Sequence, residues 1–157
     1  MTQTQPSAAA TFKPSYAGYA VAAQRIFDGQ GLMHTIGARL VSIAPGACSI
    51  ELPYGEAVSQ QHKYFHGGAI GAIADVAAGC AAFTLMPEGS EVLTVEYKLN
   101  LVKAGRPPLL LAEAQVLRPG RTLTVCRAEV HRVDGDVREL CAVLQATMMR
   151  LDPTAQS

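Results

Sequence analysis

The chain has 157 residues, the usual size of one domain, and its 13 Lys and Arg residues balance its 13 Asp and Glu residues. A net charge of zero argues against a broad nucleic-acid-binding surface, because such a surface needs basic residues to displace the counterions of the phosphates. Charged residues make up only 17% and hydrophobic residues 49% of the chain. This composition argues against disorder over most of the length and favours a subunit of an oligomer.

The two ends and the cysteines indicate the setting of the protein. Residues 1–15 are polar and contain Ala and Pro, so we expect a mobile tail followed by a single domain over 16–157. The N-terminus has no basic segment followed by an apolar run, so no secretory signal is predicted. The four cysteines are scattered, without a CxxC pair, so we expect no structural zinc site and reduced thiols in the cytoplasm.

Hydrophobic periodicity and turn residues divide the domain into helices and strands. The predicted elements, in chain order, are a helix over 16–28, strands over 36–43 and 47–52, an irregular segment over 53–65, a helix over 69–86, and strands over 92–102, 109–117, 122–132 and 137–151. The consecutive late strands with short turns predict an antiparallel sheet. One apolar helix with one sheet predicts an α+β fold in which the sheet curls around the helix.

The segment over 69–86 is apolar apart from Asp75 and reaches the length at which a membrane span must be considered. It consists mostly of Ala and Gly, and a mid-span carboxylate costs about 2.5–3.5 kcal/mol in a bilayer. We therefore predict a buried helix and no membrane contact. A helix that is apolar on all sides must be covered on all sides, and one curled sheet leaves part of it bare. This favours a dimer.

The strand over 92–102 shows a regular alternation of apolar and polar residues. The alternation places Leu93, Val95, Tyr97, Leu99 and Leu101 on one face and Thr94, Glu96, Lys98 and Asn100 on the other. The pattern predicts a half-buried strand whose polar face presents Thr94.

The densest group of chemically useful residues runs from Gln60 to Gly68 and is followed by Asp75. Two glycines at the start of a helix leave free N–H groups at its positive end, which suits an oxygen that becomes negative during acyl transfer. Asp75 lies eight residues beyond Gly67, or roughly 12 Å along a helix. Both groups must approach one reacting carbonyl, so we expect a site shared between two antiparallel helices of a dimer.

The segment His66-Gly67-Gly68-(x6)-Asp75, with a side-chain amide six residues before the His, resembles the hotdog-fold acyl-CoA thioesterases of the PaaI-like, phenylacetate-degradation group. The likeness extends from about residue 30 to residue 150 in the order of elements as well as in the motif. The resemblance implies a hotdog fold, a homodimer or dimer of dimers, and hydrolysis of an acyl-CoA. Coenzyme A would be part of the substrate, and no cofactor is expected because thioesters are already activated.

The same resemblance implies roles for individual residues. Gly67 would supply the oxyanion N–H, and Asp75 would act as nucleophile or general base. The amide that places a water or the thioester corresponds to Gln60, with Gln61 as an adjacent alternative. A hydroxyl from the strand after the helix corresponds to Thr94. Gly67, Asp75, Gln60 and Thr94, together with His66, are the predicted catalytic set, and Gln61 is expected among the substrate-binding residues.

Further residues have weaker assignments. Gly68 is expected to contact the substrate, and His66 either takes a direct role or only holds its loop. Arg118 and Arg121, on either side of Gly120, could bind the phosphates of CoA, as a similar basic turn does in the family, or could simply be solvated. His62 and His66 are four residues apart but have no third ligand beside them, so no metal site is predicted.

Two alternative functions remain open on the same fold. A hydratase or dehydratase acting on acyl-CoA or acyl-carrier protein generally pairs a His with a carboxylate, and His66 leaves that chemistry available. A non-catalytic acyl-CoA-binding protein would bind ligand without turnover. The acyl group itself is open between phenylacetyl, short aliphatic and longer fatty chains.

Overall fold

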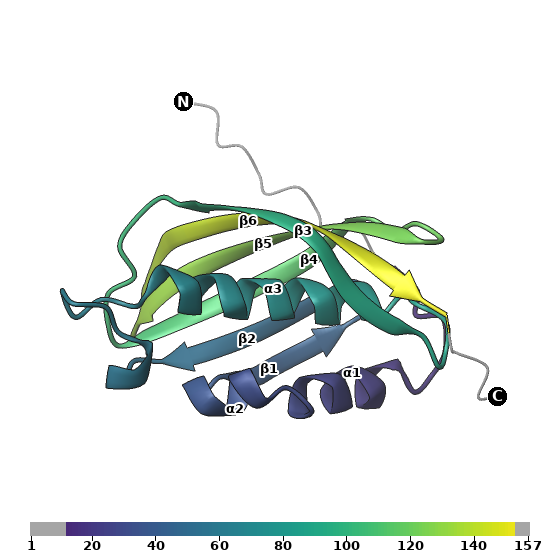
Figure 1. The fold of residues 1–157 in the computed structure, drawn as a ribbon, viewed down its shortest axis with the longest axis horizontal. Coiled ribbons are helices and arrows are strands. Elements are labelled where there is room, and N and C mark those ends of the chain that lie inside the picture. The colour runs from purple at the N-terminus through teal and green to yellow at the C-terminus, as the bar shows by residue number, and fades with distance from the viewer. Residues whose placement is uncertain (1–11, 153–157) are drawn as a thin grey trace.

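The computed structural model describes residues 12–152 and contains six strands and three α-helices in that range. The strands are β1 (Arg39–Ala44), β2 (Ala47–Pro53), β3 (Glu91–Leu101), β4 (Leu109–Arg118), β5 (Leu123–Asp134) and β6 (Val137–Leu151), and the helices are α1 (Tyr19–Asp28), α2 (Gly31–Ile36) and α3 (Gly67–Phe83). The strands form one antiparallel sheet in the order β1-β2-β4-β5-β6-β3, which curls around α3 (Figure 1). The predicted α+β architecture, a curled sheet around one long central helix, is confirmed.

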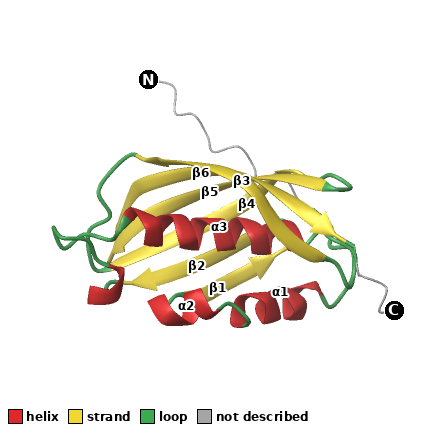
Figure 2. Cartoon of the chain, viewed as in Figure 1, coloured by secondary structure: helices red, strands yellow, loops and turns green. Residues whose placement is uncertain are grey.

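Helix α3 forms the centre of the core because its sequence combines high helix propensity with small side chains. Its alanines lie almost entirely out of solvent, and Ile73 contributes a large, fully buried side chain. Small residues let the helix lie close to the concave face of the sheet, as Figure 2 shows. Thr84 fixes its C-terminal end, since the hydroxyl accepts from the Gly46 N–H and donates to the Ala81 carbonyl, both at 2.7 Å.

The N-terminal segment differs from the prediction. Gly29 ends α1 as expected, but Gly31 begins a second short helix, α2, which the sequence did not predict. Gly37 ends α2 with φ of 73°, a left-handed conformation that glycine adopts without strain, and Met33 anchors the helix in the core. The first strand therefore begins at Arg39 rather than at residue 36.

The predicted mobile tail lies mostly outside the described residues, which begin at residue 12. Within the described part, Phe12 packs against the core, and the Ser15 hydroxyl donates to the Leu85 carbonyl at 2.7 Å. The central helix covers residues 67–83 rather than 69–86. Among residues 12–152, no helix combines the length and the apolar character needed to cross a bilayer.

A bulge in β3 overturns one predicted strand face. Thr94 pairs with Met148 and Glu96 pairs with Thr147, so Val95 is an extra residue without an opposite partner. Residues paired directly across antiparallel strands lie on the same face of the sheet. Met148 is fully buried beneath the helix, whereas Thr147 lies on the outer face, so the two faces exchange at Val95.

The exchange turns Thr94 inward, toward α3, on the same side as the apolar residues that follow the bulge. Leu99 and Tyr97 approach Gly71 of α3, and Leu101 approaches Gly67. The prediction that Thr94 shares a polar face with Glu96, Lys98 and Asn100 is therefore wrong. A strict period of two fails here because a single inserted residue reverses the direction of every side chain that follows it.

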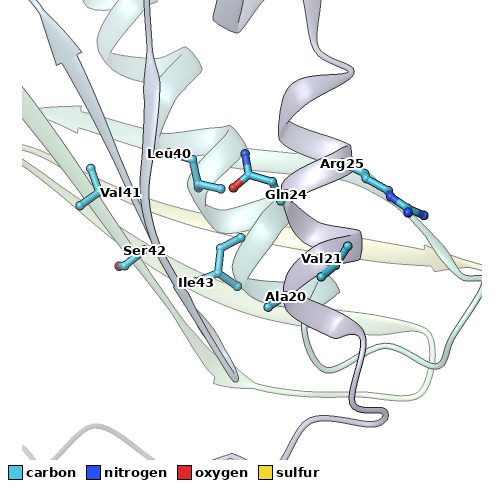
Figure 3. A pocket seen from close by; sticks show the side chains of 8 residues that line it. All are labelled: Ala20, Val21, Gln24, Arg25, Leu40, Val41, Ser42 and Ile43. Atoms are coloured by element: carbon cyan, nitrogen blue, oxygen red, sulfur yellow. The ribbon is translucent and has the colours of Figure 1, made fainter.

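The two edges of the sheet are covered differently. Helix α1 packs against β1 and leaves a cavity of about 420 Å³ between them (Figure 3). At the other edge, strand β3 has 11 residues, and three of its apolar side chains stay exposed in the single chain: Leu93, Val95 and Leu101 are 52%, 53% and 54% accessible. A long apolar edge strand of this kind is a template for pairing with another strand. The half-buried strand that the pattern predicted is therefore largely exposed in a single chain.

Candidate active site

The first turn of α3 leaves backbone donors free, and the Gly67 N–H is one of them. His66 is the N-cap, and its Nδ1 accepts from the Gly68 N–H at 2.9 Å, while its carbonyl accepts from the Ile70 N–H at 3.1 Å. The Gly67 N–H has no hydrogen-bond partner among the described residues. This donor lies at the positive end of the helix dipole and is therefore suited to an anionic oxygen. A Cβ at Gly67 would approach Leu101 Cδ1 to 2.9 Å, so glycine also preserves the close packing.

The loop before α3 brings a side-chain amide to the same place. The Gln60 N–H donates to the Tyr64 carbonyl at 2.9 Å, and Gln60 Oε1 accepts from the His62 N–H. The NH₂ group of Gln60 thus remains available, and Gln60 lines a cavity of about 370 Å³ together with Gly67. Gln61, the alternative, is exposed and does not line this cavity. The geometry therefore favours Gln60 over Gln61 as the functional amide.

Asp75 lies about two helical turns further along α3 and is half-buried. The Thr94 hydroxyl donates to Asp75 Oδ1 at 2.8 Å, a contact that depends on the inward turn of Thr94 at the bulge. Burial raises the pKa of the Asp75 carboxyl above its usual range, and the hydrogen bond from Thr94 partly opposes the rise. Asp75 is therefore a stronger base than an exposed aspartate.

The structure distributes four of the five predicted catalytic residues over two cavities of the chain, and the fifth, His66, lines neither of them. Gln60 and Gly67 line one, and Asp75 and Thr94 line a second cavity of about 270 Å³. Neither of these two cavities contains both the donors and the carboxylate. Eight residues of an α-helix rise by roughly 12 Å, which explains the separation. Because the helix is rigid, Gly67 and Asp75 of the same chain cannot both contact one substrate carbonyl.

The basic turn between β4 and β5 lies away from both cavities. Arg118 and Arg121 are exposed, line neither cavity and form no ion pair within residues 12–152. Gly120 is required at this turn because a Cβ would lie 2.1 Å from the Leu123 carbonyl oxygen. A backbone hydrogen bond from Val116 to the turn between β1 and β2 fixes this corner beside the C-terminal end of α3.

Sequence reasoning predicted only Asp75 and Thr94 among the residues that line this cavity and missed the others, among them Ile26, Gln30 and Gly79. Gly79 follows Asp75 by four residues, so helical spacing could have placed it on the same face. Gln30 gives no such signal, because it stands alone between two glycines at the junction of α1 and α2. In the described part of the chain, no three His, Cys, Asp or Glu side chains gather as metal ligands would.

Comparison with known proteins identifies the family. The model of the thioesterase superfamily matches residues 62–139. A solved structure of a thioesterase family protein from Silicibacter pomeroyi has a TM-score of 0.84 and 38% identity, covering 86% of this chain and 99% of that one. The 1,4-dihydroxy-2-naphthoyl-CoA hydrolase of Listeria monocytogenes is 29% identical over 111 residues, 71% of this chain and 89% of the relative.

A more distant structure shares the fold. The PaaI protein of the phenylacetic acid degradation operon of E. coli has a TM-score of 0.76 at 20% identity, covering 87% of this chain and 96% of that one. The similarity to the Silicibacter protein covers nearly the whole length of that protein. It therefore reaches well beyond the segment of this chain that the family model matches. The curled sheet, the central helix and these matches agree: this chain belongs to the thioesterase superfamily and has the hotdog fold.

Proposed function

We propose that this protein hydrolyses acyl-CoA thioesters to a free acid and coenzyme A at a site shared between two copies of the chain. One copy supplies Gln60 and Gly67, and the other supplies Asp75 and Thr94. The observation that carries this proposal is the separation of these residues into two cavities on a single chain. The Listeria relative is a 1,4-dihydroxy-2-naphthoyl-CoA hydrolase, which supports the choice of substrate class.

The exposed edge of β3 supports the shared site. Pairing of two β3 edges about a two-fold axis would continue the sheet and cover Val95 and Leu101, which are exposed in a single chain. The same axis would set two α3 helices antiparallel, so that the first turn of one faces the middle of the other. A homodimer, or a dimer of such dimers, would therefore contain two equivalent sites for each pair of chains.

The chemistry assigned to each group follows from its surroundings. The Gly67 N–H would donate to the thioester oxygen as it becomes negative, with the helix dipole adding positive potential. Asp75 would attack the carbonyl carbon or take a proton from the attacking water. The carbon–sulfur bond then breaks, and the thiolate of CoA leaves and takes a proton from water or from Asp75. If Asp75 itself attacks the carbonyl carbon, water then hydrolyses the resulting anhydride, which releases the free acid and restores the carboxylate. The NH₂ group of Gln60 would orient the water or the thioester, and Thr94 would hold the carboxylate.

The remaining assignments are part of the same proposal. His66 acts as a positioning residue, because its ring caps α3 and occupies the Gly68 N–H, which leaves the Gly67 N–H for substrate. Arg118 and Arg121 contact the phosphates of CoA. No metal or redox cofactor takes part, and the protein acts in the cytoplasm.

A thiol-release assay over aryl-, short-chain and fatty-acyl-CoA substrates tests the activity. Release of CoA thiol is expected for at least one class, and enoyl-CoA hydration without thiol release would instead indicate the hydratase alternative. A protein that binds acyl-CoA but neither releases thiol nor hydrates an enoyl group would be the non-catalytic binding protein. Either of these results would contradict the proposed hydrolase.

Mixed dimers test the sharing of the site. Asp75→Asn and Gln60→Leu chains, each impaired alone, are co-expressed with different tags and purified through both tags. A mixed dimer would contain one intact site and one site with both changes, so the doubly purified dimer should show about half of wild-type activity. If each chain carried a whole site, no mixture would exceed the activity of the two variants alone.

A further inference from the structure

The two-fold axis of the proposed dimer has a defined place on α3. The shared site sets Gly67 of one copy opposite Asp75 of the other, on antiparallel helices. In such a pair of helices, the residue midway between the two positions lies opposite its own copy. That residue is Gly71, one helical turn, or about 6 Å, from each of the two groups. The axis therefore passes beside Gly71.

The contacts of β3 lead to the same place. The Thr94 hydroxyl reaches Asp75, and Leu101 lies against Gly67, so the middle of this stretch of strand falls at residues 97–98. Tyr97 faces α3, and its hydroxyl oxygen lies 3.6 Å from the position that a Cβ would take at Gly71. The helix and the strand thus bring Gly71 and Tyr97 to one axis.

The Tyr97 ring is open toward this axis. Its partner on β6, Ala146, is small and fully buried, and Gly71 has no side chain. Tyr97 is 46% exposed in a single chain although it faces α3. The side-chain hydrogen bonds of β3 involve Thr94 and Glu96 and leave the Tyr97 hydroxyl without a partner among residues 12–152. An exposed aromatic ring with a free hydroxyl is typical of the core of a protein interface.

A side chain on a two-fold axis must be compatible with its own copy. Two like charges that meet there repel each other, whereas a phenol is neutral and both donates and accepts a hydrogen bond. Glu96, the charged residue before Tyr97, lies on the outer face, where it pairs with Thr147. The residue that faces the axis on the inner side of the sheet is therefore a self-complementary one.

We propose that Tyr97 is a positioning residue of the shared site, an inference that rests on the hydrolysis and the dimer proposed above. The two Tyr97 rings meet at the axis, fill the space beside Gly71 of both helices, and form a hydrogen bond between their hydroxyls. This contact fixes the spacing of the two helices. It thereby fixes the distance from the Gly67 N–H of one copy to the Asp75 carboxylate of the other, without touching the substrate.

A tyrosine cross-link tests the placement. Photo-oxidation with a ruthenium complex and persulfate joins tyrosine rings that are in contact: each ring loses one electron and one proton, persulfate accepts the electrons, and a carbon–carbon bond forms. The wild-type protein should give a covalent dimer on a denaturing gel, with dityrosine fluorescence. Tyr97→Phe should lose this product, and Tyr19→Phe, on α1, is the matched control that should keep it. An undiminished cross-link in Tyr97→Phe would overturn the placement.

Steady-state kinetics test the positioning role, at a protein concentration at which size-exclusion chromatography shows a dimer. Tyr97→Ala removes the ring, so kcat should fall at least about tenfold while KM changes less than about twofold, because the reacting groups are misplaced rather than lost. If Tyr97→Ala does not fold or dimerise, Tyr97→Leu takes its place, and the same division between kcat and KM is expected. An unchanged kcat, or a rise in KM alone, would contradict the role.

The conservative variant separates the ring from its hydroxyl. Tyr97→Phe keeps the ring and should retain kcat within about twofold, while loss of one hydrogen bond raises the Kd of the dimer by about three- to tenfold. A loss of kcat in the Tyr97→Phe dimer as large as in Tyr97→Ala would indicate that the hydroxyl acts in the reaction itself and would contradict a positioning role.

The outcomes separate the two proposals, because the cross-link needs no substrate. A dimer that cross-links through Tyr97 but releases no thiol from any acyl-CoA would overturn the proposed hydrolysis and the positioning role with it. An active dimer whose cross-link does not depend on Tyr97 would overturn this inference alone. A cross-link lost in Tyr97→Phe, together with a loss of kcat in Tyr97→Ala, would support it.

Discussion

The first turn of α3 and its middle carry opposite kinds of chemistry. The first turn offers hydrogen-bond donors, the Gly67 N–H and the Gln60 NH₂, at the positive end of a helix dipole. The middle offers a carboxylate, Asp75, whose pKa is raised by burial and whose oxygen is held by Thr94. The helix that positions both regions also keeps them roughly 12 Å apart. Each region thus lacks what the other supplies, so neither is expected to catalyse hydrolysis alone.

Removing the base should produce the largest effect. Asp75→Asn keeps the shape and a partner for Thr94 but removes the charge, so kcat should fall by about 10²–10⁴-fold in the thiol-release assay. Asp136→Asn, in the exposed turn between β5 and β6, is the matched control and should retain full activity. Near-wild-type turnover of Asp75→Asn would show that the middle of α3 takes no part in the chemistry.

Separating the two copies should have the next largest effect, because it would part the donors from the carboxylate. Val95→Lys places a charge on the exposed edge of β3 and should yield a monomer with at least about tenfold lower activity. Val41→Lys is a matched control, since Val41 is also 53% exposed but lies on β1, at the opposite edge of the sheet. Size-exclusion chromatography and thiol release, measured at one protein concentration, check both variants. An active Val95→Lys monomer would contradict the shared site.

The hydrogen bond from Thr94 should have a smaller effect, visible in the pH profile. Thr94 donates to the ionised carboxylate and lowers its pKa, so Thr94→Val should raise the pKa further. Because burial raises the Asp75 pKa above its ordinary value of 3.8, the acidic limb of kcat/KM should lie above that pH in the wild-type protein and at still higher pH in the variant. At a pH above the acidic limbs of both proteins, kcat/KM of Thr94→Val should be less than about tenfold below that of the wild-type protein. An acidic limb at the same pH in both proteins would mean that a group other than Asp75 controls it.

The smallest expected effect is on stability and has the opposite sign to the effect on activity. Because burial raises the Asp75 pKa, the folded protein binds this proton more tightly than the unfolded chain, and wild-type stability falls as pH rises through the folded pKa. Asp75→Asn avoids this loss and should be more stable than the wild-type protein at pH 7. Denaturant unfolding should show the gain shrinking as pH is lowered through that pKa. A gain in stability that does not depend on pH would show that it does not arise from the raised pKa of Asp75.

Much of the fold could be predicted from local pattern. The turn pairs and the alternation after residue 109 gave β4, β5 and β6 within a few residues, since sheet periodicity and turn chemistry are local properties. The spacing between Gly67 and Asp75 predicted their separation, because helical rise is fixed. Helix α2 was missed because its six residues contain few local signals, and a left-handed glycine after it decides where it ends.

The site was predicted less completely than the fold. Gln60 and Gly67 were expected together and do line one cavity. Thr94 was expected to contribute a hydroxyl to the site from the family resemblance, but its strand face was assigned wrongly. A bulge is set by the partner strand rather than by the sequence of β3 alone. Gln30 could not be predicted at all, since its place in the cavity depends on how α1 packs against α3.

The sequence by itself determined the properties that depend on near neighbours: an Ala-rich helix, alternating strands, a glycine turn before the helix and a carboxylate a fixed rise beyond it. These follow from backbone geometry and side-chain volume within a few residues. Only the tertiary structure decided which strand edge stays bare, that Val95 bulges and turns Thr94 inward, and that Gln30 closes the Asp75 cavity. Those features arise from contacts between segments far apart in the chain, whose register and packing no local pattern encodes.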